Sequence, residues 1–368
     1  MKILLVGDYS NYHACLGAAL ERLGHNVTIA SDGSAWMQTH TDIALRRLLP
    51  RKAGGALLYA KMLTDRGLRG FDVVSLIGPA FVTLRPKRMR HVFNLLQRHN
   101  GRVFLGAVGN DKAMMDYLVS PDSKLRYSEY FVDGRPYEPN HAEFLKQSLW
   151  QTGAIADWCE EIYDRVDGVT TALYEYHLAM LRRFPADKVH YTGIPIDTKA
   201  VKPIERELMS SGKVHLFLGR HADRQVFKGT DRIGRAAERV AAELPEKCSL
   251  SIVENLPYDE YIQRLRSADL VLDQLYSYTP ATNALLAMAA GQAVLSGGEE
   301  DYYDFIGEKQ LRPIINAVPD DEKLYETIKN CVLHPEIIRQ AGAQGRDFVL
   351  HHNDSELVAQ RHLEFWKK

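Results

Sequence analysis

The sequence predicts an α/β fold made of two doubly wound domains, each Rossmann-like, that face a central cleft. Short apolar stretches alternate with amphipathic ones, as strands alternate with helices in proteins with parallel sheets. The alternation stops at a polar, proline-bearing segment, 198–212, and then starts again. We therefore expect an N-terminal domain over 1–197 and a C-terminal domain over 198–354. A helix near 355–368 is expected to pack back on the N-terminal domain.

The N-terminal half opens with a strand–helix–strand unit. Residues 2–7 (KILLVG) are apolar on both faces, as a buried parallel strand requires. Residues 11–23 carry an apolar stripe, with Ser10 or Asn11 as the expected cap. Further strands are expected over 26–30, 72–77, 102–107 and 188–197, and helices over 86–98 and 154–183. The segment 110–150, rich in Tyr, Asp and Pro, is predicted to be irregular.

The C-terminal half repeats the same alternation. The expected strands are 214–218, 249–253, 269–272 and 293–296, and the expected helices are 230–243, 258–267 and 282–290. Ligands of doubly wound sheets bind at the carboxyl ends of the strands, so the loops that follow these strands are where we expect a site.

Composition and charge argue against several classes of protein. The chain has 46 basic and 47 acidic residues, and the resulting net charge of −1 does not favour nucleic acid as a partner. The four cysteines form no C-x-x-C pair, which predicts no metal site and fits a reducing, cytoplasmic location. Asp8 interrupts the opening apolar run too early for a signal peptide. The motif G-x-G-x-x-G does not follow the first strand, which disfavours a dinucleotide-dependent oxidoreductase.

The loop after the first strand of the C-terminal half has the chemistry of an anion site. Gly219 lets a ligand approach the backbone, Arg220 offers a planar fork for phosphate oxygens, and Lys228 adds a point charge. Arg224 lies between these two cations, and the helix that begins near Thr230 adds unpaired N–H groups. Together these groups could bind a diphosphate and stabilise it as a leaving group. A solvated basic loop is the equally open alternative.

A second candidate region for ligand binding covers residues 269–300. Tyr278 and Thr279 lie in a loop rich in hydroxyl groups, and an Ala-rich helix begins near Thr282 and Asn283. Unpaired N–H groups at the start of that helix can hold phosphate or sugar hydroxyls. A plain α/β crossover also explains the Ala-rich helix, but it explains the cluster of polar side chains less well.

These motifs, in this order, resemble the family 4 retaining glycosyltransferases of the GT-B fold. Residues 219–220 (GR) with 228–229 (KG) are similar to the diphosphate clamp of that family, and residues 287–291 (AMAAG) to its Glu-Ala-Met-Ala-x-Gly stretch. Residues 193–197 (GIPID) resemble the turn that ends its N-terminal domain, and residues 24–27 (GHNV) resemble the entry to its second strand. The resemblance implies a UDP- or GDP-linked sugar donor held mainly by the C-terminal domain. It also implies an acceptor that faces the N-terminal domain, and no required cofactor or metal.

The chain departs from this family at two glutamates that usually stand eight positions apart. Tyr278 and Leu286 occupy those positions, and Leu286 cannot bind the donor ribose as the second glutamate usually does. The expected substitutes are Glu299, Glu300 or Asp273, with Glu254 as a further donor-binding residue. Altered or lost donor binding is the open alternative. Because the clamp is longer than usual, Arg224 is expected to share the role of Lys228.

Two loops of the N-terminal half are expected on the acceptor side. The first contains Asp8, Tyr9, Asn11 and His13, of which His13 is the candidate partner of the transferred sugar or the acceptor. A surface or helix-capping histidine is the alternative.

The second loop follows strand 102–107 and contains Asn110 and Asp111. Asp111 could orient an acceptor hydroxyl or act as a base, and a turn built on Asn-Asp chemistry is the alternative. The candidate catalytic residues are therefore His13, Asp111, Arg220 and Lys228.

Two basic stretches suggest a peripheral contact with a membrane surface. The first contains Arg46, Arg47, Arg51 and Lys52 around Leu48 and Leu49, and the second contains Arg85, Lys87, Arg88 and Arg90. Such stretches can contact anionic headgroups at the inner face of the membrane, which would suit a lipid-linked acceptor. Solvated helix faces are the more common origin of such charges.

The leading hypothesis is transfer of a sugar, with retention, from a nucleoside-diphosphate sugar to a saccharide or lipid-linked acceptor, in surface polysaccharide or glycan synthesis. A sugar-nucleotide epimerase on the same fold would need carboxylates for acid/base work, which Asp111, Glu299 and Glu300 could supply. A non-catalytic protein that binds nucleotide or carbohydrate is the third hypothesis.

Overall fold

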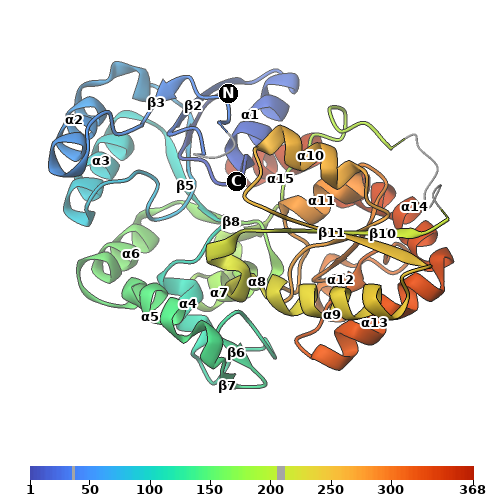
Figure 1. The fold of residues 1–368 in the computed structure, drawn as a ribbon. Helices are drawn as coiled ribbons and strands as arrows, with labels where there is room; N and C mark the ends of the chain where they lie inside the picture. Colours follow the sequence, from blue (N-terminus) through green and yellow to red (C-terminus); the bar gives the residue numbers. More distant parts are fainter. Residues whose placement is uncertain (35–37, 205–211) are drawn as a thin grey trace. The chain divides into compact units, whose positions relative to one another are not determined.

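The computed structural model describes residues 1–34, 38–204 and 212–368, so the segment expected to link two domains lies partly outside the described residues. The chain divides into two compact units (Figure 1). The first unit comprises Met1–Ser123, Leu145–Asp197 and Ser355–Lys368. The second comprises Lys124–Phe144 and Thr198–Asp354.

The first unit is built on a parallel sheet of seven strands in the order β3-β2-β1-β4-β5-β8-β9. The strands are β1 (Lys2–Val6), β2 (Asn26–Ser31), β3 (Ile43–Ala44), β4 (Val73–Leu76), β5 (Arg102–Ala107), β8 (Gly168–Thr171) and β9 (Val189–Tyr191). The chain turns from one half of the sheet to the other between β1 and β4, which is the kind of position where such sheets bind ligands.

Helices cover this sheet and connect its strands. They are α1 (Tyr12–Arg22), α2 (Arg51–Thr64), α3 (Pro86–His99), α4 (Lys112–Leu118), α6 (Gly153–Arg165), α7 (Tyr174–Arg183) and α15 (Ser355–Lys367). Helix α3 begins with a proline, whose fixed φ angle and missing N–H group suit the first helical position.

The second unit is built on a parallel sheet of five strands in the order β11-β10-β12-β13-β14. The strands are β10 (Val214–Arg220), β11 (Cys248–Glu254), β12 (Leu270–Leu272), β13 (Ala293–Ser296) and β14 (Ile315–Asn316). The helices are α8 (Gln225–Lys228), α9 (Thr230–Glu243), α10 (Tyr258–Arg266), α11 (Thr282–Ala289), α12 (Glu300–Ile306), α13 (Asp321–Leu333) and α14 (Pro335–His352). Helices α9 and α13 lie on one side of the sheet, and α10 and α11 on the other (Figure 1).

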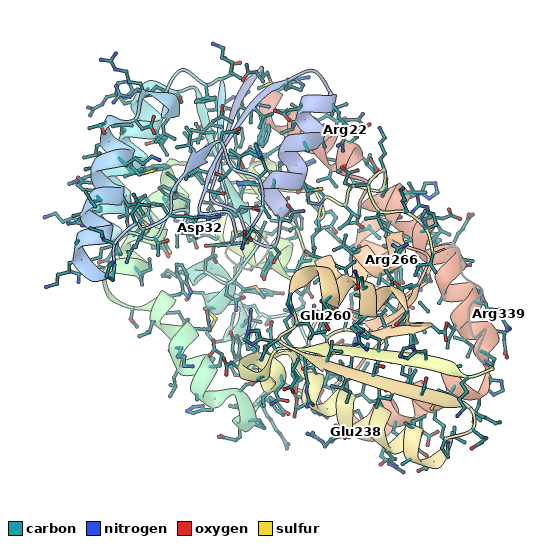
Figure 2. All side chains as sticks on the ribbon, turned by 45° about the horizontal axis from the view of Figure 1, so that its top comes forward. Arg22, Asp32, Glu238, Glu260, Arg266 and Arg339 are labelled. Atoms are coloured by element: carbon teal, nitrogen blue, oxygen red, sulfur yellow. The ribbon has the colours of Figure 1, made fainter. Side chains whose placement is uncertain are left out.

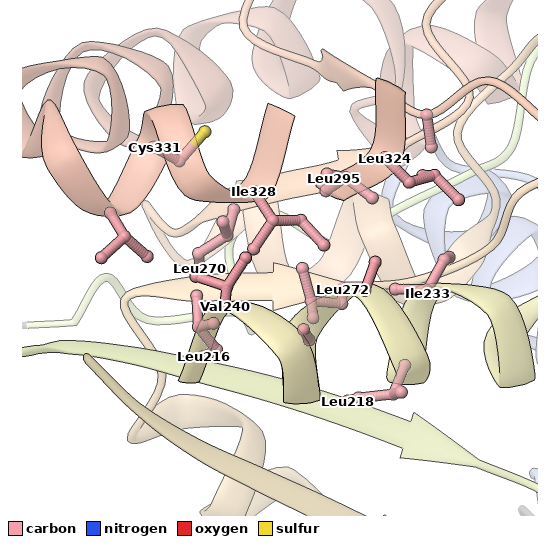
Figure 3. Packing of buried hydrophobic residues seen from close by; sticks show 14 of the residues in the cluster. Leu216, Leu218, Ile233, Val240, Leu270, Leu272, Leu295, Leu324, Ile328 and Cys331 are labelled. Atoms are coloured by element: carbon pink, nitrogen blue, oxygen red, sulfur yellow. The ribbon is translucent and has the colours of Figure 1, made fainter. Parts of the chain in front are cut away.

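An apolar core lies between this sheet and the helices α9 and α13 (Figure 3). The strands contribute Leu216, Leu218, Leu270, Leu272 and Leu295, and the helices contribute Ile233, Val240, Leu324, Ile328 and Cys331. Because apolar side chains fill the face of the sheet, polar side chains are left to the loops at the strand ends. The ends of the buried strands therefore determine the positions at which these polar loops begin.

The last helix, α15, belongs to the first unit. The ring of Phe365 lies 5.5 Å from that of Phe104 on β5. On α1, Arg22 (labelled in Figure 2) pairs with Asp197 at 3.0 Å and with Glu356 at 2.9 Å. Packing and charge thus hold the end of the chain against the sheet of the first unit.

Two regions differ from the sequence-based prediction. The single helical stretch predicted over 154–183 is wrong, because the buried strand β8 separates α6 from α7. The β-branched run Val169, Thr170 and Thr171 suits that central position in the sheet. The irregular segment predicted over 110–150 contains α4, α5 (His141–Gln147) and a hairpin of β6 (Phe131–Val132) with β7 (Arg135–Pro136).

The other predicted strands and helices are present, although β9 is shorter than the strand expected over 188–197. Helices α2, α13 and α14 lie in stretches for which the sequence analysis predicts no helix. None of the helices in the described parts of the chain combines the length and the apolar content that crossing a membrane requires.

Candidate functional site

The parallel strands of the second unit bring four polar residues to one edge of the sheet. Arg220 ends β10, Glu254 ends β11, Asp273 follows β12, and Ser296 ends β13. Since β10 pairs in register with β11 up to Arg220 and Glu254, these two side chains are direct neighbours. This edge is where a doubly wound sheet is expected to bind its ligand.

The predicted clamp residues Gly219 and Arg220 lie at the end of β10. A Cβ atom at position 219 would come within 2.4 Å of Cε2 of Tyr261 on α10, so only glycine lets that ring cover the backbone. The Nε–H of Arg220 donates to the carboxylate of Glu254. Glu254, expected to contact a donor, therefore also holds the Arg220 guanidinium in place.

Two further cations of the clamp follow on a short helix. Lys228 ends α8, and Gly229 then turns the chain at a φ of 69°, where a Cβ atom would come within 2.5 Å of the Cβ of Leu275. The guanidinium of Arg224 lies over the ring of Phe227, with its carbon 5.0 Å from the ring centroid. Within the described part of the chain, neither Arg224 nor Lys228 has a carboxylate at ion-pair distance. Two unneutralised cations thus precede the N-terminus of α9.

A chain of hydrogen bonds joins the ends of β12 and β13 to α10 and α11. The Tyr261 hydroxyl donates to Oδ1 of Asn283 at 2.9 Å, and Nδ2 of Asn283 donates to Oδ1 of Asp273 at 3.0 Å. The Ser296 hydroxyl donates to the other oxygen of Asp273, also at 3.0 Å. This network fixes the first turn of α11, whose N-terminus has no side-chain cap. The backbone N–H groups of that turn can therefore serve an anionic ligand.

Most of the remaining donor-binding candidates are buried or already have protein partners. Thr282 begins α11, and Thr279 is buried in the loop before it. The Tyr278 hydroxyl accepts the backbone N–H of Arg126 at 2.6 Å. Glu299 is buried at the start of α12, and Glu300 pairs with Arg312.

In the first unit, Asp8 and Tyr9 line a cavity of about 420 Å³ at the carboxyl ends of β1, β2 and β4. Its other lining residues are mostly apolar and include Ile77, Phe81, Val82, Leu84 and Met89. Asp32, labelled in Figure 2, adds a second carboxylate to the lining. The cavity thus combines apolar walls with two acidic side chains.

The loop between β1 and α1 is organised by Asp8 and not by the expected cap. Asn11 stands at the N-cap position with a φ of 66°, but its side chain makes no capping bond. Oδ1 of Asp8 accepts the N–H of His13 at 2.8 Å, and Oδ2 accepts the Thr39 hydroxyl at 2.8 Å. Burial raises the pKa of Asp8, and these hydrogen bonds partly oppose the rise.

His13 is almost fully buried and its ring makes contacts within the first unit. Nδ1 lies 2.6 Å from the carbonyl oxygen of Gly7, so it carries the proton and donates, and Nε2 lies 3.4 Å from the Ser75 hydroxyl. Burial lowers the pKa of His13 to about 4. A neutral histidine that ties the loop to the sheet is the role this geometry favours.

Asn110 and Asp111 follow β5. Asp111 caps α4, with Oδ1 accepting the N–H of Met114 at 3.0 Å. Burial raises the pKa of Asp111 to about 6, and the hydrogen bonds to its carboxylate oppose that rise. Capping of α4 is a sufficient structural role for Asp111 and requires no ligand. The raised pKa of Asp111 would also suit a general base.

Sequence reasoning missed three residues at the edge of the second sheet. Tyr261 covers Gly219 and holds Asn283, and Arg126 and Tyr127 contact Tyr278 and Glu299. No local pattern marks Tyr261, which follows an ordinary helical spacing. The tyrosines of the segment 110–150 were the one signal for the other two.

Comparison with solved structures shows that the chain has the GT-B fold of two Rossmann-like domains. Sucrose-phosphate synthase from Thermosynechococcus elongatus matches with a TM-score of 0.61 at 15% identity, over 100% of this chain and 98% of that one. Anabaena HepE, in complex with UDP and glucose, matches with a TM-score of 0.60 at 11% identity, over 100% and 99% of the two chains.

A Listeria monocytogenes protein named as a UDP-N-acetylglucosamine 2-epimerase matches with a TM-score of 0.54 at 12% identity, over 99% of this chain and 94% of that one. No protein-family model and no curated protein sequence matches the chain. The likeness is therefore one of fold.

The burial of His13 predicts a pH-dependent stability of the first unit. Because the folded pKa is about 4 and the ordinary value is 6.5, only the unfolded chain takes up this proton between those pH values. Stability should therefore fall as the pH drops from 7 to 5, by about 2 kcal/mol for this residue. His13→Asn keeps an N–H donor for Gly7 but cannot titrate, so it should remove that part of the loss.

Urea unfolding at pH 7 and pH 5 measures this difference. His99→Asn, at an exposed histidine on α3, is the matched control and should keep the wild-type dependence. An equal loss in wild type and His13→Asn would contradict the assignment.

Proposed function

We propose that this protein is a glycosyltransferase that moves a sugar from a nucleoside-diphosphate sugar to an acceptor. The observation that carries the proposal is the cluster of Arg220, Arg224 and Lys228 at the carboxyl edge of the second sheet, of which only Arg220 has a carboxylate partner among the described residues. A diphosphate supplies the missing negative charge. The GT-B fold supports this assignment, and HepE of that fold was solved with UDP and glucose.

The chemistry follows from where charge develops during transfer. As the bond between sugar and diphosphate breaks, negative charge grows on the leaving phosphate oxygen. Cations already held nearby stabilise that charge, because they need no reorganisation at the moment of reaction. Arg220 is fixed for this by Glu254, and Lys228 by the turn at Gly229. The first turn of α11 offers N–H groups to the same phosphates.

The finer assignment follows the resemblance to family 4: a UDP- or GDP-linked donor and retention of anomeric configuration. Leu286 cannot bind a ribose, and Asp273 and Glu299 are buried in hydrogen-bond networks. Glu254 remains about 41% exposed at the end of β11. For that reason we propose that the carboxylate of Glu254 binds the ribose hydroxyls of the donor.

The cavity in the first unit is our proposed acceptor site. Its walls are mainly apolar, and Asp8 and Asp32 can accept hydrogen bonds from hydroxyl groups. Such a lining suits an acceptor with an apolar part, such as a lipid-linked saccharide, better than a bare oligosaccharide.

A peripheral contact with the cytoplasmic face of a membrane would bring such an acceptor to the cavity. Leu48 is 85% exposed and Leu49 is 47% exposed, and Arg46, Arg47 and Lys52 lie around them. Exposed leucines flanked by cations are what an anionic bilayer surface binds. The side chain of Arg51, expected in the same cluster, lies outside the described residues.

The first test is a thermal-shift panel of UDP-, GDP-, ADP- and CDP-sugars, followed by transfer from the donor that binds. Binding to the native state raises the melting temperature by linkage, so we expect one nucleotide class to stand out. NMR of the product should show the donor's anomeric configuration. Inversion would contradict the family 4 assignment, and the lack of any response would contradict the proposed function.

The same panel separates the epimerase hypothesis from transfer. UDP-N-acetylglucosamine incubated without an acceptor should come back unchanged if the protein is a transferase. Appearance of the epimerised sugar would favour the epimerase. Binding without turnover on any acceptor would favour a non-catalytic binding protein.

The clamp predicts that Arg220→Ala and Lys228→Ala each weaken binding of the nucleoside diphosphate at least tenfold, which is about 1.4 kcal/mol. Each change removes a cation from the site of the phosphates. Calorimetry with UDP, or with the diphosphate that the panel selects, measures the loss. Lys247→Ala is the matched control, because Lys247 is exposed next to the amino end of β11, away from the proposed site. Unchanged affinity in both variants would remove the clamp from the proposal.

The membrane contact predicts that the double change Leu48→Ser and Leu49→Ser weakens binding to anionic vesicles at least tenfold, since each buried leucine contributes about 1.5–3 kcal/mol. Co-sedimentation with phosphatidylcholine vesicles, with and without phosphatidylglycerol, measures this. Leu181→Ser on α7 is the control for an exposed leucine elsewhere. Equal sedimentation of wild type and double variant would contradict the contact.

A further inference from the structure

A segment from the first half of the chain completes the second unit. Residues 124–144, here called the strap, precede the rest of that unit by more than fifty residues of chain but pack with it. The strap contains the hairpin of β6 and β7 and the start of α5. It contacts both loops that we assign to the donor.

One end of the strap holds the helix that carries Lys228. Nδ2 of Asn140 donates to the carbonyl of Val226 on α8 at 3.1 Å and to the carbonyl of Glu129 at 2.7 Å. The ring of Tyr130 lies 5.9 Å from that of Phe227. Asn140 and Tyr130 are both buried, so the strap is a packed part of this unit.

The other end of the strap covers Tyr278 and Glu299. The ring of Tyr127 lies 4.8 Å from that of Tyr278, and its hydroxyl donates to Oε1 of Glu299 at 2.6 Å. Nη2 of Arg126 donates to Oε2 of the same carboxylate, and Nδ2 of Asn316 donates to Oε1 at 2.9 Å. Three donors, two from the strap and one from β14, thus satisfy a buried carboxylate. Neither Tyr278 nor Glu299 remains open to a sugar.

Arg126 is the exposed member of this cluster. Its side chain is 59% exposed, whereas that of Glu299 beneath it is 7% exposed. A guanidinium has five N–H donors, and the hydrogen bonds to Glu299 and to the Tyr278 hydroxyl use only part of them. The guanidinium of Arg126, held by Glu299, therefore has N–H groups left to bind a ligand above the Tyr278 loop.

We propose that Arg126 binds the sugar hydroxyls of the nucleotide sugar, above the loop in which Tyr278 stands in place of the first family 4 glutamate. The inference rests on the proposed function, because it needs a nucleotide sugar in the second unit. Tyr278 is buried under the strap, so Arg126 of the strap supplies an exposed polar group where Tyr278 offers none.

The charges around Arg126 indicate which sugars fit. Glu299 neutralises the guanidinium, and a carboxylate oxygen of Asp301 lies 3.8 Å away. The cluster therefore offers directed N–H donors but no net positive charge. A neutral hexose can accept these hydrogen bonds, whereas a uronate would meet two carboxylates. The site should prefer a neutral sugar to a uronic acid on the same nucleotide.

The test compares the affinities for UDP and UDP-glucose by calorimetry in the wild type and in Arg126→Ala. We expect the variant to bind UDP-glucose about tenfold more weakly and UDP within about twofold of the wild type. Arg126→Lys keeps the charge but loses the fork, so it should recover only part of the affinity. Glu299→Gln removes the charged anchor of Arg126 and should reproduce the selective loss.

Arg135→Ala is the matched control, because Arg135 is an exposed arginine of β7 in the same strap. Circular dichroism and melting temperature show whether each variant folds. UDP-glucose should also bind wild type more tightly than UDP-glucuronate.

The outcomes separate the two proposals. If wild type binds UDP and UDP-glucose but Arg126→Ala weakens both equally or neither, Arg126 does not bind the sugar and the proposed function stands. Tighter binding of UDP-glucuronate would overturn the neutral-sugar preference. If wild type binds neither ligand, nor any other nucleotide and nucleotide sugar of the panel, both proposals fail.

Discussion

The parallel register of β10, β11, β12 and β13 is the constraint on which the proposed site depends. Parallel strands all end at the same edge of a sheet, so residues far apart in the chain become neighbours there. Arg220 thereby meets Glu254, and Asp273 meets Ser296. The apolar core beneath holds this arrangement without using the polar side chains. The chemistry of the edge is therefore set by the few residues that follow each strand.

A second theme of the structure is that its buried acidic side chains are hydrogen-bonded. Asp8 accepts bonds from His13 and Thr39, Asp273 from Asn283 and Ser296, and Glu299 from the strap and Asn316. A buried carboxylate without such donors would cost several kcal/mol of stability. Several acidic residues that the sequence suggests as ligand-binding groups are consequently structural anchors as well.

The sequence alone predicted the alternation of strands and helices well, because apolar periodicity is a local property. Helix α9 over Thr230–Glu243 and strand β10 are examples. The strand β8 was missed since its buried residues continue an apolar pattern that also fits a helix.

The clamp around Arg220 and Lys228 could be proposed because glycines and cations cluster within one loop. The contacts of Arg126 could not be predicted, because its partners lie more than 150 residues further along the chain. The contact of His13 with Ser75 is non-local in the same way.

The strap also has a consequence for how the chain acquires its structure. Residues 124–144 leave the ribosome well before α8, the Tyr278 loop and Glu299, so they must wait for their binding partners during synthesis. Contacts of such high contact order close late and slow the folding of the unit that needs them. A fragment limited to residues 198–354 would keep the sheet but leave Glu299 without two of its hydrogen-bond donors. The C-terminal half of the sequence therefore lacks a packed part of its own unit, even though it contains every strand of its main sheet.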